Sequence, residues 1–320
     1  MEENSDLTIE QVNQLKSESD KWSKRTGIVG LFVFIIPFLI FVATFVSFDR
    51  VFTGNNDGIV GMIVGGFALF PIIVVALMIT LIIFLIFMVK RRSAYRAAYK
   101  KFFSHRVLTE LLKEYYYDHA SGISKTDLSS VGMVRLGNRY RSEDYVSGRY
   151  KDVGFAQADI LIQDEHTDSD GDTRTETYFN GRWMVFEFPR RFVAKLAVVG
   201  RRTQSSIYAR GMEKFPTESV EFNKEFKVYM QDGVEMFYLL DPKMIETMQA
   251  LAEKFAGRIF FLFVDKKLHI GLNNGFDSFE PPKHKKGDLD TVEEIERLSS
   301  EFNVVFDLID ALEINRKIFK

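Results

Sequence analysis

Residues 59–89 read IVGMIVGGFALFPIIVVALMITLIIFLIFMV, a run of 31 residues without a charge. A helix needs about 20 apolar residues to cross the ~30 Å hydrocarbon core of a bilayer, so this run predicts a transmembrane helix. The buried helices of soluble proteins rarely continue this far without a charge on any face. As a single helix the run is roughly 46 Å long, which requires it to tilt or to protrude from the membrane.

A second uncharged segment, residues 27–48, lies toward the N-terminus. Its 22 residues are rich in Phe, Ile and Leu and match the length of one further span. Only the short polar link 49–58 separates the two segments, so we expect a transmembrane helical hairpin over residues 27–89. A cleaved signal peptide fits poorly, because the apolar stretch is too long and a second one follows it.

The basic residues around the hairpin predict its orientation. Lys21, Lys24 and Arg25 precede the first segment, seven cations follow the second over residues 90–106, and the link carries Arg50 alone. Because basic residues stay on the cytoplasmic side, both termini should lie in the cytoplasm. The basic run after the second segment also suits anionic lipid headgroups, and the alternative is that it serves only as a topology signal.

The two spans offer few polar groups for a transport path. Thr44, Ser47 and Thr80 are their only hydroxyl side chains, and they contain no ionisable residue, whereas ion and substrate paths use ionisable groups. A pore is therefore the weaker interpretation. Gly61 and Gly65 form a G-x-x-x-G pair that allows close helix packing, either between the two spans or between protomers of a homo-oligomer.

The rest of the chain predicts an α+β fold in the cytosol. Residues 1–26 form an amphipathic lead-in with a Thr8/Gln11 capping box, residues 90–117 a basic helical stalk, and residues 118–320 a mixed α+β domain. Short β-prone runs dominate from about residue 131 to 211, and Asn180-Gly181 is the strongest hairpin-turn signal among them. Further strands are expected over residues 225–230, 234–240, 258–264 and 267–270. Two helices are expected later, one starting at Asp241-Pro242 and ending before Gly257, the other capped by Asp290 with Glu293.

Composition excludes several kinds of chemistry. The chain has no cysteine, which removes disulfides, thiolate metal sites and cysteine nucleophiles. Its net charge of −2 gives no support for a nucleic-acid binder. No phosphate-binding glycine loop or G-x-S-x-G elbow occurs. The five histidines share no metal-ligand spacing and are expected to be surface or structural residues: His105, His119, His166, His269 and His284.

One acidic cluster, residues 164–172, invites a calcium interpretation. Asp168, Asp170 and Asp172 alternate, but Gly171 stands fourth from Asp168 and not sixth, and Phe179 falls where the bidentate Glu of an EF-hand belongs. We therefore expect a solvated hairpin tip. The sequence nominates no catalytic, cofactor-binding or metal-ligating residue and no cofactor, and it leaves open whether the protein is an enzyme.

Several segments together resemble a bacterial membrane-protein family known as domain of unknown function 3137. The resemblance is carried by residues 143–148 (EDYVSG), 179–183 (FNGRW), 218–229 (ESVEFNKEFKVY), 238–244 (YLLDPKM) and 279–280 (FE). It implies a two-span protein of the bacterial inner membrane with a cytosolic α+β domain, and no established activity. Such proteins are often encoded near a small membrane-associated LemA-type protein, so it also implies a partner of that type.

These inferences lead to one main expectation and two alternatives. The main one is a membrane-anchored cytosolic interaction or regulatory module, whose partners are the lipid bilayer and a membrane-associated protein. One alternative is a membrane-tethered enzyme acting on a lipid-derived or envelope substrate. The other is an oligomeric transport element. A pocket with convergent, pKa-perturbed carboxylates or histidines would favour the enzyme, and a wet polar lumen the transporter.

Overall fold

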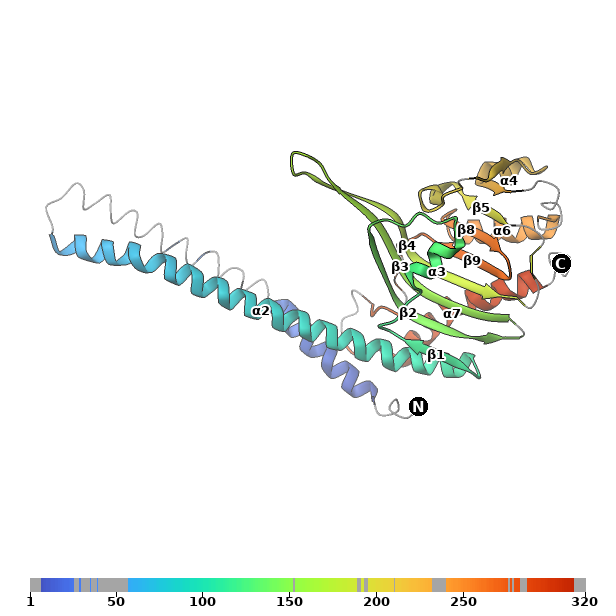
Figure 1. The fold of residues 1–320 in the computed structure, drawn as a ribbon. Coiled ribbons are helices and arrows are strands. Elements are labelled where there is room, and N and C mark those ends of the chain that lie inside the picture. The colour runs from blue at the N-terminus through green and yellow to red at the C-terminus, as the bar shows by residue number, and fades with distance from the viewer. Residues whose placement is uncertain are drawn as a thin grey trace. The chain divides into compact units, whose positions relative to one another are not determined.

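The computed structural model describes residues 7–25, 29, 35, 39, 57–151, 153–188, 191–192, 195–209, 211–231, 240–275, 277, 279–282 and 287–313 (Figure 1). The chain divides into two units, one made of residues 1–102 with 281–289 and the other of residues 103–280 with 290–320.

The main element of the first unit is α2 (Asp57–Leu111), a continuous helix that passes through Pro71. Its segment Val74–Leu111 is the one helix in the described part of the chain that is long and apolar enough to cross a membrane. Nine large apolar side chains between Val75 and Val89 are 37% to 59% exposed. The predicted first span, residues 27–48, lies outside the described residues except at three positions, so the hairpin remains a prediction.

The predicted stalk is correct only in part. The helix ends at Leu111, and Tyr115–Asp118 form strand β1 instead of a further helical turn. β1 pairs with β2 (Arg139–Tyr150), with Tyr117 opposite Val146. The apolar spacing of residues 93–117 fits a helix, but strand pairing with a segment 30 residues away stabilises the extended form at its end.

The second unit is built on one nine-stranded sheet in the order β1-β2-β3-β4-β9-β8-β5-β7-β6. Every neighbouring pair is antiparallel. The strands not yet given are β3 (Val153–Thr167), β4 (Thr173–Glu187), β5 (Leu196–Gly200), β6 (Glu213–Phe215), β7 (Phe226–Met230), β8 (Ile259–Val264) and β9 (Lys267–Leu272). The mixed α+β class is thus confirmed.

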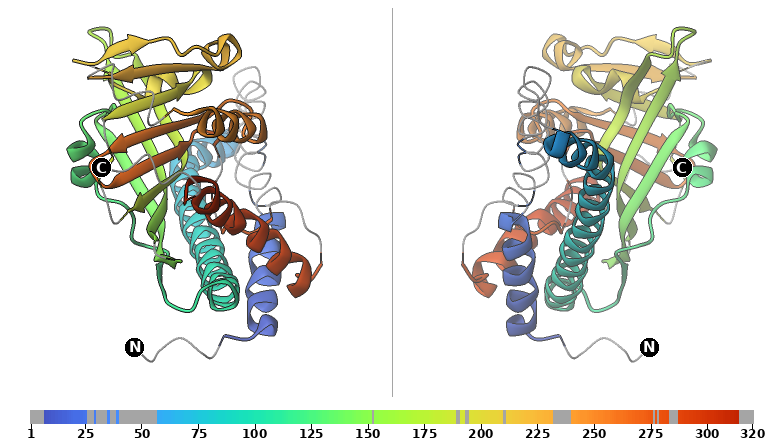
Figure 2. Two further views of the ribbon diagram at one scale, coloured as in Figure 1. Left: turned by 90° about the vertical axis from the view of Figure 1, so that its right-hand side faces the viewer. Right: turned by 90° about the vertical axis from the view of Figure 1, so that its left-hand side faces the viewer.

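Helices cover both faces of this sheet (Figure 2). On one face lies α3 (Lys125–Val131), whose Leu128 and Val131 join a buried cluster that includes Trp183. On the other face lie α6 (Pro242–Lys254) and α7 (Thr291–Glu313). The Phe302 ring of α7 contacts Phe155 of β3 at a centroid distance of 6.5 Å. The remaining described helices are the N-terminal helix of residues 9–25 in the first unit and the short η1 (Arg201–Ser206) and α4 (Val220–Glu225) in the second.

Three predicted helix starts are confirmed by their caps. The capping contacts are Gln11 N to Thr8 Oγ1 (3.3 Å), Met244 N to Asp241 Oδ1 (2.8 Å) and Glu293 N to Asp290 Oδ1 (3.1 Å). Strand β7 lies where alternation predicted it, and β8 and β9 lie where strands were predicted on either side of the Asp265-Lys266 turn. The predicted strand 234–240 lies outside the described residues except for Leu240.

The predicted Asn180-Gly181 turn is wrong, because β4 continues through both residues. Gly181 has φ +150°, and a Cβ there would lie 2.1 Å from the carbonyl oxygen of Leu272, so its role is to let β9 approach closely. The β3–β4 turn lies instead in the acidic cluster, where Asp168 N donates to Asp172 O at 2.9 Å. The prediction of a hairpin tip at that cluster is confirmed.

Candidate functional site

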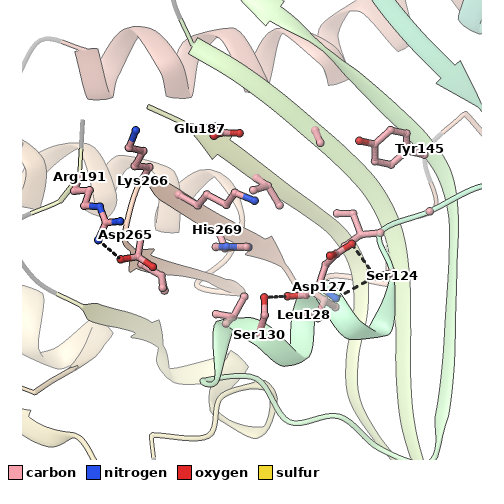
Figure 3. A pocket seen from close by; sticks show the side chains of 17 residues that line it. Ser124, Asp127, Leu128, Ser130, Tyr145, Glu187, Arg191, Asp265, Lys266 and His269 are labelled. Carbon is pink, nitrogen blue, oxygen red and sulfur yellow. Dashed lines mark hydrogen bonds and ion pairs between the residues drawn. The ribbon is translucent and has the colours of Figure 1, made fainter. Parts of the chain in front are cut away.

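A cavity of about 580 Å³ opens on the sheet face that carries α3 (Figure 3). Its floor is a row of paired residues across three strands, since Ala156 of β3 faces Val185 of β4, which faces His269 of β9. One wall is α3, with Leu128, and the opposite wall is the β8–β9 turn. Because the side chain of Ala156 is small, space remains above the floor, and α3 covers only part of it.

His269 is the most unusual residue of this cavity. Its ring is 6% exposed, and its Nδ1 accepts a hydrogen bond from the Nε1–H of the fully buried Trp183 at 3.2 Å. An indole nitrogen only donates, so Nδ1 carries no proton and the neutral ring has its proton on Nε2. Burial, with a smaller contribution from the positive charge of Lys267, lowers the pKa of His269 from 6.5 to about 4.

The consequence is a neutral hydrogen-bond donor in the cavity floor. Among the residues that the structure describes, none forms a hydrogen bond or ion pair with the Nε2 of His269, so this N–H is available to an acceptor that enters. A general base needs a free lone pair and a pKa near the operating pH. The lone pair of His269 is held by Trp183 and its pKa is low. The ring is therefore suited to binding and not to proton abstraction.

The hydroxyl groups near His269 serve α3. Ser124 Oγ accepts from Asp127 N (3.0 Å) and donates to Asp127 Oδ2 (2.7 Å), which caps the helix. Ser130 Oγ donates to the carbonyl oxygen of Asp127 at 2.6 Å. Neither serine has a hydrogen bond to His269, so the described part of the cavity lacks the nucleophile–base pair that covalent catalysis requires.

Charged side chains surround the cavity without giving it a net charge. The acids Asp127, Glu187 and Asp265 equal in number the bases Arg191, Lys266 and Lys267. Arg191 and Asp265 form an exposed ion pair at 3.5 Å, which contributes little to stability. Mixed rim charge around an apolar floor is typical of a recognition pocket, where a few polar groups fix the orientation of the ligand.

From the sequence, His269 is only one of five scattered histidines. The structure does not bring together the four that it describes, and His284 lies outside the described residues. Nδ1 of His105 lies 2.6 Å from Tyr115 Oη, His166 forms an ion pair with Asp164 on the β3–β4 hairpin, and His119 is exposed. The predicted strand 267–270 correctly included His269. Its hydrogen bond to Trp183 joins residues 86 positions apart, so no pattern in the sequence around His269 could predict it.

A second polar group of residues lies on the α7 side of the sheet. Tyr117 Oη donates to Asp144 Oδ1 at 3.1 Å, and burial followed by the negative charge of Asp144 raises the pKa of Tyr117. Glu143, Asp144 and Asp277 have carboxylate oxygens within 4.8 Å of one another, so a cation would find three ligands there. Asp144, one of the three acids, already accepts the hydrogen bond from Tyr117.

The comparisons with known proteins add one match. Neither a curated protein nor a solved structure matches the chain. A family model described as "Protein of unknown function (DUF3137)" matches residues 177–314. The matched region includes Trp183 and His269 but not α2, α3 or β2, so it covers less of the chain than the resemblance in the sequence implied. Residues 177–314 of the chain thus match this family of unknown function.

Proposed function

We propose that the chain is a membrane-anchored recognition module. Its apolar N-terminal part holds it in the bilayer, and the α+β domain offers the His269 cavity to a partner. The observation that supports this most strongly is α2, whose large apolar side chains between Val75 and Val89 remain exposed along the helix. Hydrocarbon is the surrounding that stabilises such a surface, because water is unfavourable for it.

The proposal includes the topology expected from the sequence. Residues 27–48 form a second span beside α2, both termini face the cytoplasm, and the membrane is the bacterial inner membrane. Thr80, the one hydroxyl in the described part of the spans, donates to Ala76 O at 2.9 Å within its own helix. Because this hydroxyl is satisfied locally, it is not needed to line a path, which favours an anchor over a transport element.

Membrane anchoring is tested on cell membranes that contain the full chain. We expect the protein to stay in the membrane pellet after an alkaline carbonate wash. A cytoplasmic reporter fused after Lys320 should be active, and one that requires export should be silent. Release of the full chain by carbonate refutes the anchor, and activity of the exported reporter refutes the orientation.

The residues of the cavity floor suggest how the cavity would bind a partner. Apolar side chains would take an apolar group of the partner, while the Nε2–H of His269 donates to a carbonyl or carboxylate beside it. The partner that we propose is a small membrane-associated LemA-type protein. Because both proteins would be held at one membrane, a modest affinity of this site is sufficient for binding.

Recognition by the cavity is tested with a substitution that fills it. In Ala156→Phe the new ring occupies the space beside Val185 and His269, so capture of the LemA-type protein from a detergent extract should fall at least about tenfold, the loss typical of an interface hot spot. Ala250→Phe, on the exposed side of α6, is the matched control and should capture as the wild type does. Equal capture by both variants refutes the role of the cavity.

A further inference from the structure

The N-terminal helix, residues 9–25, lies alongside α2 in the first unit (Figures 1 and 2). The Trp22 ring lies 5.2 Å from the Phe84 ring and 6.0 Å from the Phe87 ring, measured between centroids. Glu18 forms an ion pair with Arg91. Lower numbers on one helix meet higher numbers on the other, so the two helices run antiparallel. The end of the N-terminal helix is therefore level with the last apolar turns of α2.

This alignment gathers cations that the sequence separates by more than 60 residues. Lys21, Lys24 and Arg25 come from one helix, and Lys90 and Arg92 from the other. These contacts place Lys21 level with about residue 87 of α2, and Lys24 and Arg25 level with about residues 84 and 83. With a rise of 1.5 Å per residue, the five cations therefore spread over roughly 14 Å along the helix pair. We call these five residues the basic band.

The positive charges of the basic band are not neutralised by acidic side chains of the described residues. All five side chains are exposed, and none has an ion-pair partner among the residues that the structure describes. Two acids lie near it: Glu18 is already paired with Arg91, and Asp20 is exposed one residue before Lys21. Five like charges gathered on one pair of helices repel one another in water, so a negatively charged surface would stabilise this arrangement.

Trp22 marks the depth of this region in a membrane. Tryptophan favours the boundary between hydrocarbon and headgroups, where its ring is apolar and its N–H meets water or a phosphate. The Phe84 and Phe87 rings that it contacts belong to the apolar stretch of α2, and Lys90 follows them within one turn. Long basic side chains beside such a ring reach outward to the phosphate layer.

We propose that the basic band binds the headgroups of anionic phospholipids, so that the anchor selects a lipid class in the membrane that it crosses. This inference rests on the proposed membrane anchoring and adds a partner to it. The Trp22 contacts hold the two helices in register, and the long side chains of the five cations then reach lipid phosphates at one side of the membrane. The function of the band is thus to enrich anionic lipid around the anchor.

The test uses the full chain reconstituted into phosphatidylcholine vesicles that contain a small fraction of phosphatidylglycerol. Bromine atoms on the acyl chains of one lipid class quench a nearby indole, so Trp22 emission reports which class surrounds it. The emission of a Trp22→Phe variant is subtracted to remove the Trp183 signal. At equal mole fractions, brominated phosphatidylglycerol should quench Trp22 several times more than brominated phosphatidylcholine.

Two variants with equal loss of charge make the test specific. In Lys21→Gln/Lys24→Gln/Arg25→Gln the preference for phosphatidylglycerol should largely disappear, because each cation near the surface strengthens lipid binding by about fivefold. In Lys214→Gln/Lys224→Gln/Lys243→Gln, three exposed positions of the second unit, the preference should be unchanged. Soluble glycerol phosphate should not compete, which separates a lipid surface from a site for free phosphate.

The outcomes distinguish the two proposals. Equal quenching by both brominated lipids in the wild type overturns lipid selection and leaves the anchor intact, as does a preference that persists in the Lys21/Lys24/Arg25 variant. Competition by glycerol phosphate overturns the lipid source. If no brominated lipid quenches Trp22 and the chain fails to float with the vesicles, the anchoring itself is wrong.

Discussion

Acidification should destabilise the α+β domain through His269. Its folded-state pKa of about 4 lies below the ordinary value of 6.5, because burial disfavours the charged ring. The unfolded chain therefore binds more protons than the folded chain between these two values. The stabilisation associated with the neutral ring is fully present above pH ~6.5 and is lost as the pH falls toward ~4.

The magnitude follows from the same two values. A difference of one pKa unit corresponds to about 1.4 kcal/mol, so the full shift amounts to about 3 kcal/mol. At about pH 5 most of the unfolded chains are protonated at this residue and few folded ones are, which leaves a loss of about 2 kcal/mol. The folded ring resists protonation because Nδ1 would have to give up the hydrogen bond from Trp183.

The assay is urea unfolding of the full chain in detergent micelles at about pH 7.5 and pH 5, followed by Trp183 emission in a Trp22→Phe background. Other groups also titrate over this range, so the comparison is with His269→Asn, which should lose about 2 kcal/mol less stability on acidification. His119→Asn, at an exposed site, is the matched control and should behave as the parent does. If the parent and His269→Asn lose the same stability, the argument for a buried neutral histidine is refuted.

Two further predictions concern the core of the sheet. Gly271→Ala should cost about 1–3 kcal/mol in the free energy of unfolding, because its Cβ would lie 2.1 Å from the Phe260 ring; Gly154→Ala, with nothing within 4 Å, is the control, and equal unfolding midpoints for the two variants would contradict this reasoning. Arg182→Met should cost about 3 kcal/mol in the free energy of unfolding. It removes the hydrogen bond from Arg182 Nη1 to the backbone carbonyl of Glu301 (3.0 Å), and it leaves the partly buried carboxylate of Glu301 without one of its cations. Adding Glu301→Leu to Arg182→Met should recover part of the loss in the same urea titration, and a further loss would speak against this pairing.

Much of the secondary structure could be predicted, because its causes are local. Asp241, Pro242 and Gly257 mark the limits of α6 by capping and backbone preference alone. The alternation of apolar residues in β7 likewise depends only on neighbours along the chain. The predictions failed where distant segments decide, as at Asn180-Gly181, whose local turn preference is overridden by pairing of β4 with β3 and β9.

The candidate site escaped prediction for the same reason. Ala156, Val185 and His269 form the floor only because the strand order places β9 between β8 and β4, although β4 lies 80 residues earlier in the sequence. No spacing along the chain connects them. The protonation of His269 depends on burial and on Trp183, and neither can be read from a lone histidine in an apolar strand.

The sequence alone determined the apolar character of the proposed anchor, the basic residues at its ends and the α+β class. The reason is that hydrophobicity, charge and the spacing of apolar residues are properties of neighbouring residues in the chain. Only the tertiary structure decided the order of the nine strands, the cavity around His269 and the alignment that places Trp22 against Phe84 and Phe87. These features arise from contacts between residues tens of positions apart, and such contacts form only when the whole chain has packed.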